Sequence, residues 1–129
     1  MAAKSFRDLT VYKKAFELAM EIFKISKRFP KEEMYSLTDQ VRRSSRSVCS
    51  CIGEAYRKRL YPAYFVSKSS DADMENTETK IWLDFACNCK YITNDEYKNL
   101  MDKADEIGRL LNHMENNPEK YQTNQQREK

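Results

Sequence analysis

Arginine side chains cluster in one stretch of this chain, and a guanidinium group binds phosphates and carboxylates through paired hydrogen bonds. The stretch covers residues 40–59, QVRRSSRSVCSCIGEAYRKR. If it is helical, three of its arginines point within about 60° of one another and a fourth lies about 40° further round. This pattern predicts a surface for an anionic partner. The candidate nucleic-acid contacts are Arg42, Arg43, Arg46, Arg57, Lys58 and Arg59.

The same stretch has a second side, which is apolar. Its small aliphatic residues lie roughly 100° or more away from the arginines on the helical wheel. A helix with one apolar side and one guanidinium side is typical of a bundle member that also contacts an anion. The predicted core residues on this helix are Val41, Val48, Ile52 and Ala55.

Four cysteines form two Cys-x-Cys pairs, at positions 49 and 51 and at positions 87 and 89. Zinc sites favour Cys-x₂-Cys or wider spacing, whereas helical residues two apart diverge by about 200°. If the chain folds back near Leu60, the two pairs lie roughly 22 Å apart along the helix axis. That separation also excludes disulfides between the pairs. We predict buried, reduced thiols and no metal site.

Other residues that could do acid–base chemistry are isolated. His113 is the only histidine, and it falls on the polar side of its predicted helix. Carboxylate pairs such as Glu32 with Glu33, or Asp71 with Glu75, are common on solvated helix faces. Two glycines are too few for a phosphate-binding or dinucleotide-binding loop. The sequence therefore predicts a protein that is not an enzyme and that has no cofactor.

The elements that position these residues follow from composition. A chain of 129 residues with two glycines and three prolines is expected to form one domain of long helices. The sequence has neither the roughly 20-residue apolar run of a membrane span nor the apolar core of a signal peptide. We therefore expect a soluble, cytoplasmic protein with no membrane partner.

Charge is distributed unevenly along the chain. Residues 4–59 hold 14 Lys and Arg against 7 Asp and Glu, whereas residues 61–121 hold 7 against 12. The basic first half is a candidate anion-binding surface. Alternatively, the two halves neutralise each other, within one bundle or between subunits.

Apolar periodicity predicts four helices. The first covers about residues 9–28, with Asp8 as its N-cap and Pro30 beyond its end. Its apolar side is expected to hold Ala15, Phe16, Ala19, Ile22, Phe23 and Phe29. The second begins between residues 31 and 37 and reaches about residue 60.

The third helix begins at Pro62 and reaches about residue 90. Its heptad-like seam comprises Phe65, Ser69, Ala72, Asn76, Thr79, Leu83 and Ala86, and apolar residues on its other faces indicate a further neighbour, such as another subunit. A capping box of Thr93 and Glu96 begins the fourth helix. Its core face comprises Tyr97, Leu100, Met101, Ala104, Ile107, Leu111 and Met114.

These elements predict an all-α fold. Short connections favour an antiparallel up-down-up-down four-helix bundle. We expect a single domain over residues 1–121 and a disordered polar tail over residues 122–129.

Several motifs carry a family resemblance. Residues 6–15 read F-x-D-L-x-V-x-x-K-A, residues 29–43 read F-P-x-E-E-x-Y-x-L-T-x-Q-x-R-R, and Cys51-Ile52-Gly53-Glu54-Ala55 follow Ser47-Val48. This order resembles the small bacterial four-helix-bundle family named for proteins encoded in intervening sequences of 23S rRNA genes, once called S23 ribosomal proteins. The resemblance covers about residues 6–114.

The resemblance implies a four-helix bundle that assembles as a ring-shaped homopentamer and has no established enzymatic activity. It also includes a relative, the accessory protein of diversity-generating retroelements, a basic bundle that binds nucleic acid and a reverse transcriptase. The chain departs from the family pattern: Cys51 stands for Asn, Gly53 for Ala and Ala55 for Gly, and Asp71-Ala72 replace a Gly-Ser pair. A function tied to those positions is not implied here.

Two functions remain open. In the first, the protein binds nucleic acid, RNA being favoured, through the six basic residues named above; few aromatics flank them in sequence, so base stacking has little support. In the second, the protein is an oligomeric interaction scaffold. Its arginines then form salt bridges with Asp71, Glu75 and Glu78, within one subunit or between subunits.

Overall fold

The structure is a computed structural model that describes residues 4–127, with side chains through residue 122. Every regular element in that part is helical, as predicted. The α-helices are α1 (Thr10–Ser26), α2 (Leu37–Arg57), α3 (Pro62–Asn88), α4 (Asn94–Asn116) and α5 (Pro118–Arg127), and two short 3₁₀ helices are η1 (Phe6–Asp8) and η2 (Lys31–Glu33). Within the described residues, no helix is long and apolar enough to cross a bilayer.

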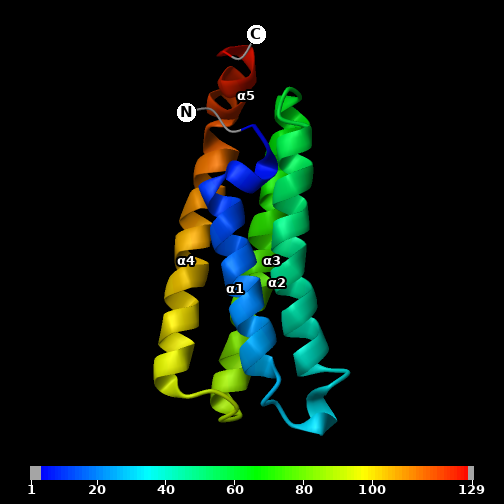
Figure 1. The fold of residues 1–129 in the computed structure, drawn as a ribbon, viewed down its shortest axis with the longest axis vertical. Helices are drawn as coiled ribbons and strands as arrows, with labels where there is room; N and C mark the ends of the chain where they lie inside the picture. Colours follow the sequence, from blue (N-terminus) through cyan, green and yellow to red (C-terminus); the bar gives the residue numbers. More distant parts are fainter. Residues whose placement is uncertain (1–3, 128–129) are drawn as a thin grey trace.

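The four long helices lie side by side as a bundle (Figure 1). Helix α1 packs against α2 and α4, and α3 packs against the same two helices. In the figure the chain descends α1, ascends α2, descends α3 and ascends α4, and α5 lies at the end of the bundle where α1 begins.

The start of α1 differs from the prediction. Asp8 is not the N-cap, because it belongs to η1 and Leu9 is the residue before the helix. Ser5 caps η1 by accepting a hydrogen bond from the Arg7 amide, and the Asp8 carboxylate accepts one from the Lys4 amide. The capping signal in the sequence thus belongs to a short turn that precedes α1.

The buried side of α1 also differs from the prediction. Phe16 is 51% exposed, whereas Leu18 is 2% exposed and lies in the core. The apolar residues of α1 span a wide arc, and only part of that arc faces α2 and α4. Phe16 is consequently left at the surface beside α2.

Helix α2 buries its predicted apolar side and ends earlier than predicted. Val41, Val48, Ile52 and Ala55 are all buried. The helix stops at Arg57 because Tyr61 takes an extended conformation before Pro62, and the intervening residues form the turn. Lys58 and Arg59 therefore lie beyond the helix.

Helices α3 and α4 follow the prediction closely. All seven residues of the α3 seam are buried, and the capping box of Thr93 and Glu96 is present. The polar members of the seam bond across the bundle: the Asn76 amide donates to the Ala104 carbonyl (2.9 Å), and the Thr79 hydroxyl donates to the Ser44 hydroxyl (2.8 Å). On the α4 core face, Tyr97 and Met101 are half-buried and the other members are buried.

The chain continues as a short helix after α4. The Tyr121 ring packs on Phe65, 5.1 Å between centroids, and the Gln122 side chain donates to the Leu60 carbonyl (3.1 Å). Helix α5 extends through Arg127, across most of the segment for which the sequence predicts a polar tail. Residues 128–129 lie outside the described part, and the disorder of the tail stays a prediction.

Candidate nucleic-acid interface

Three cations converge on one aromatic ring between α1 and α2. Lys27 Nζ lies 4.7 Å from the centroid of the Phe23 ring, and the guanidinium carbons of Arg42 and Arg46 lie 4.8 and 5.6 Å from it. An aromatic face attracts cations within about 6 Å of its centroid through the ring quadrupole. We call Phe23, Lys27, Arg42 and Arg46 the Phe23 cluster.

Arg42 is the most firmly held member of this cluster. Its Nε donates to the Ser26 hydroxyl (2.8 Å), and its Nη2 donates to the Phe23 carbonyl (3.4 Å). The side chain is half-buried, and these bonds join α2 to the last turn of α1. Arg42 therefore contributes positive charge to the surface while also connecting two helices.

The neighbouring arginines are open to solvent. The Arg43 side chain is 73% exposed and lies 4.0 Å from the Asp39 carboxylate one turn earlier. Arg46 is exposed. Within the described residues, Lys27, Arg42 and Arg46 have no carboxylate within 4.0 Å. Among the described residues, no paired carboxylate therefore neutralises the charge of the Phe23 cluster.

The other three predicted contacts form a second group at the end of α2. Lys58 Nζ lies 5.4 Å from the Tyr61 ring and 5.5 Å from the Tyr64 ring. Arg59 folds back over Tyr56, 3.9 Å from its ring, and donates to the Tyr56 carbonyl (2.9 Å). Arg57 is exposed and lies about 16 Å along α2 from Arg46, at about 1.5 Å per residue. The six candidates thus form two groups, one in the first half of α2 and one at its end and in the turn that follows.

The acidic residues of α3 do not pair with these arginines within the described protomer. Lys68 Nζ lies 3.3 Å from the Glu54 carboxylate and 3.6 Å from the Asp71 carboxylate. Glu78 accepts a hydrogen bond from the Trp82 indole (3.2 Å). Burial raises the pKa of Glu75, and the nearby carboxylates of Glu78 and Asp71 raise it further. The intrasubunit bridges of the scaffold hypothesis are therefore not formed.

Charges along α4 are arranged differently, because they pair with α1 and α3. Lys14 lies 3.1 Å from Glu106. Lys103 binds the Glu21 carboxylate and lies 3.8 Å from Glu17. On the α3 side, Lys80 lies 2.7 Å from Asp105. We call the α1–α4 set, together with Arg28 and Glu96, the α1/α4 seam.

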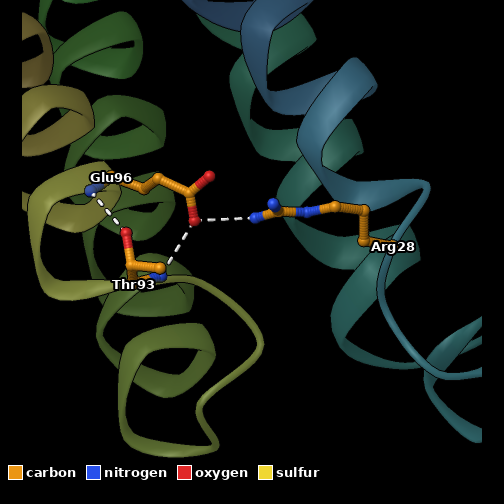
Figure 2. A network of polar contacts seen from close by, with 3 residues as sticks. All are labelled: Arg28, Thr93 and Glu96. Atoms are coloured by element: carbon orange, nitrogen blue, oxygen red, sulfur yellow. Dashed lines mark hydrogen bonds and ion pairs between the residues drawn. The ribbon is translucent and has the colours of Figure 1, made fainter.

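Figure 2 shows how that seam ends. Glu96 accepts a hydrogen bond from the Thr93 amide (2.8 Å), the Thr93 hydroxyl accepts one from the Glu96 amide (3.1 Å), and the Arg28 guanidinium reaches the same carboxylate at 2.7 Å. The bond from Arg28, followed by the one from the Thr93 amide, holds the pKa of Glu96 below its ordinary value. One carboxylate thus caps α4 and ties it to the end of α1.

The thiols are less buried than predicted. Cys49, Cys51 and Cys87 are half-buried, whereas Cys89 is exposed because it follows the last turn of α3. Burial raises the pKa of Cys49 to about 11, so its reactive thiolate form is scarce at neutral pH. In the part of the chain that is described, no group of three His, Cys, Asp or Glu residues could hold a metal ion. His113 lies near the Tyr121 hydroxyl (3.1 Å).

An apolar groove adjoins the Phe23 cluster, and sequence reasoning missed it. It has a volume of about 550 Å³ and lies between η1 and α1 on one side and α2 on the other. Sequence also missed Lys27 as part of the basic face. Both features combine residues from different helices. In the sequence, the groove was indicated only by the aromatic residues on α1, such as Tyr12 and Phe16. The groove is lined by Phe6, Tyr12, Phe16, Ala19, Met20, Arg46, Cys49, Ser50, Gly53, Glu54 and Arg57.

Comparison with known proteins identifies the family. Residues 7–113 match the family model described as 23S rRNA-intervening sequence protein. The chain belongs to this family. A family member of similar structure is a protein with unknown function from the S23 ribosomal protein family of Bacteroides thetaiotaomicron VPI-5482; the TM-score is 0.74 at 29% sequence identity, covering 82% of this chain and 95% of that chain. None of the curated proteins matches this chain.

Proposed function

We propose that this protein binds nucleic acid, with RNA favoured, through the basic face of α2, and that it does so without enzymatic activity. Its contacts are Arg42, Arg43, Arg46, Arg57, Lys58 and Arg59, joined by Lys27, which directly follows α1. RNA is the first partner to test because the family is described by an rRNA-intervening sequence. We further propose that the protein acts in the cytoplasm as an antiparallel bundle, assembled as the homopentameric ring that the family resemblance implies.

The observation that carries the proposal is the unneutralised Phe23 cluster. Lys27, Arg42 and Arg46 converge on one ring, and no carboxylate of the described residues lies within 4.0 Å of them. Cations held by an aromatic ring rather than by a carboxylate stay available to an external anion. A phosphate backbone supplies such anions at regular spacing.

The basic residues have different roles in this proposal. Arg43 and Arg46 are exposed and contact phosphates directly. Arg42 is held by Ser26 and the Phe23 carbonyl, so it adds charge from a fixed position. Contacts of this kind position nucleic acid without reading its sequence.

The test is retention of generic RNA and DNA at low and at moderate salt. The informative variant is Arg43→Gln with Arg46→Gln, because both side chains are exposed and the hydrogen bonds from α2 arginines to α1 come from Arg42. If two phosphate contacts are lost from a single strand, the slope of log affinity against log salt falls by about 1.4. Arg42 is left intact because its removal would also disturb the α1–α2 contact.

A charge-matched control removes two cations from another face. Lys98→Gln with Arg109→Gln does so on α4, where Lys98 pairs only with Asp102 in its own helix (3.2 Å). Wild type and this control are expected to retain RNA equally, and the α2 variant to retain much less. Equal retention by all three proteins, or no retention by wild type at low salt, would overturn the proposal.

A second candidate function, an oligomeric scaffold, is favoured by the outer face of α3. Met74 (70% exposed) and Phe85 (54% exposed) share this face with Ile81 and with the carboxylates of Asp71 and Glu78. An exposed apolar stripe on a bundle helix is typical of a contact between subunits. Light scattering on Met74→Glu with Ile81→Glu tests it: smaller particles support assembly through this stripe, and an unchanged mass excludes it.

A further inference from the structure

We propose that the apolar groove between α1 and α2 accepts unpaired bases, so that the preferred ligand is single-stranded rather than duplex nucleic acid. The inference rests on the proposed function, since it adds a base-binding surface to the phosphate-binding one. The groove and the Phe23 cluster are continuous, because Arg46 contributes to both.

The groove presents aromatic rings in a row. Phe6 and Tyr12 pack edge to face with centroids 5.0 Å apart, and Tyr12 and Phe16 follow at 6.0 Å. The Phe16 ring, about half exposed, is the outermost of the three. Across from α1, Gly53 has no side chain and the Phe6 ring lies directly beside it, 3.6 Å from the position of a Cβ. The Phe6 ring thus fills the space beside Gly53, and the exposed Phe16 ring is the surface on which a flat base can stack.

Charge favours a phosphate-linked occupant. On α2, Arg46 and Arg57 bound the stretch that lines the groove, and within the described residues neither forms an ion pair within 4.0 Å. Glu54 is the acidic residue of the lining, and it is neutralised by Lys68 at 3.3 Å. Aromatic rings between guanidinium groups are the arrangement with which proteins bind single strands, the rings taking bases and the cations taking phosphates.

A duplex does not fit this arrangement. Its bases are stacked and paired inside the helix, so it presents phosphates to Arg43 and Arg46 but no base to the groove. The phosphate surface alone would bind both forms, whereas the groove adds affinity for the single strand only. The two contributions are therefore separable by mutation.

The experiment measures binding of an oligouridine and of a duplex of equal length at one low salt concentration. Phe16→Ala removes the exposed ring and Phe16→Trp keeps an aromatic one. We expect Phe16→Ala to weaken oligouridine binding roughly tenfold, as the loss of one stacking contact does, and to leave duplex binding unchanged. Phe16→Trp is expected to match wild type. Tyr35→Ala, which removes an exposed aromatic ring that does not line the groove, is the matched control and is expected to change neither.

The outcomes distinguish this inference from the proposed function. If Phe16→Ala binds oligouridine as wild type does while Arg43→Gln with Arg46→Gln loses both ligands, the base-binding groove is wrong and the phosphate-binding face stands. If wild type binds neither ligand, both proposals fail. If Phe16→Ala changes the particle mass in light scattering without changing oligouridine binding, the groove is a protein contact and the inference is overturned.

Discussion

The α1/α2 face and the α1/α4 seam use the same residue types in opposite ways. Along the seam, Lys14, Lys103 and Arg28 each contact a carboxylate of the facing helix. On the α1/α2 face, Lys27, Arg42 and Arg46 gather around Phe23, with no carboxylate of the described residues within 4.0 Å. Both regions include α1, so the difference comes from the facing helix: α4 supplies carboxylates, whereas α2 supplies arginines.

This difference separates cations that hold the bundle together from cations that are open to a ligand. A paired surface cation adds little net field beyond the protein, because its partner cancels it. An unpaired group of three projects its charge into solvent. Counting charges in the sequence could not make this distinction, because Lys14 and Arg28 of the seam add to the excess of Lys and Arg in residues 4–59 just as Lys27, Arg42 and Arg46 do.

The largest expected effect on stability comes from Arg42, the member of the α1/α2 face that also bonds to α1. Arg42→Ala leaves the buried Ser26 hydroxyl without its donor and is expected to lower the free energy of unfolding by about 2 kcal/mol. Urea denaturation measures it, with Arg46→Ala as the matched control expected within about 0.5 kcal/mol of wild type. Equal stability of the two variants would mean that Arg42 does not hold the helices.

A smaller effect is expected at the end of the α1/α4 seam. Thr93→Ala removes the side-chain cap of α4 and is expected to cost about 1 kcal/mol of unfolding free energy. Thermal or urea denaturation measures it. Because Thr93 is remote from α2, RNA binding at a temperature where the variant is folded should match wild type. A loss of binding without a loss of stability would contradict the separation of the two regions.

The seam also predicts a pH dependence. The bond from Arg28 holds the pKa of Glu96 below its ordinary value, so the folded state keeps this carboxylate charged to lower pH than the unfolded state does. Its contribution to stability is therefore complete above the ordinary carboxyl pKa and is lost as the pH falls through the lowered folded value. Glu96→Gln keeps a capping side chain without the charge. Wild type should be the more stable at neutral pH, and the difference should shrink in acid; a constant difference would exclude the ion pair as its cause.

The smallest expected effect is a gain of binding. Arg43 is one of the six predicted contacts, and its guanidinium lies 4.0 Å from the Asp39 carboxylate. Asp39→Asn removes that competition and is expected to tighten RNA binding roughly twofold, as an exposed ion pair of about 0.4 kcal/mol would allow. Fluorescence anisotropy at low salt measures it. Weaker binding would show that Asp39 positions Arg43 for the ligand rather than competing with it.

Features set by neighbouring residues in one helix could be predicted from the sequence. The α3 seam follows from heptad spacing, and the α4 cap follows from Thr93 and Glu96 standing three residues apart. The predicted N-cap of α1 was wrong because Asp8 belongs to the short helix η1, and apolar periodicity does not reveal a single turn of helix before a longer one. The predicted burial of Phe16 was wrong because the apolar residues of α1 span a wide arc, and the sequence does not show which part of that arc a neighbouring helix covers.

Features that need two helices at once could not be predicted. The sequence places Arg42 and Arg46 on one face of α2, but Phe23 and Lys27 reach them only through the packing of α1. The groove beside them depends in the same way on residues of α1, such as Phe16, and residues of α2, such as Gly53, lining the same space. The aromatic ring that Arg42 and Arg46 lack nearby in the sequence thus comes from another helix.

The salt dependence of RNA binding tests the central claim most directly, because it counts the phosphates that each face neutralises. Wild type would be compared by anisotropy with Arg43→Gln, Arg46→Gln from the α1/α2 face and with Lys14→Gln, Lys103→Gln from the α1/α4 seam. Each variant removes two positive charges. We predict that the slope of log affinity against log salt falls by about 1.4 for the α1/α2 variant and stays at the wild-type value for the seam variant. Equal slopes for the two variants would contradict the claim that the unpaired face is the one that binds nucleic acid.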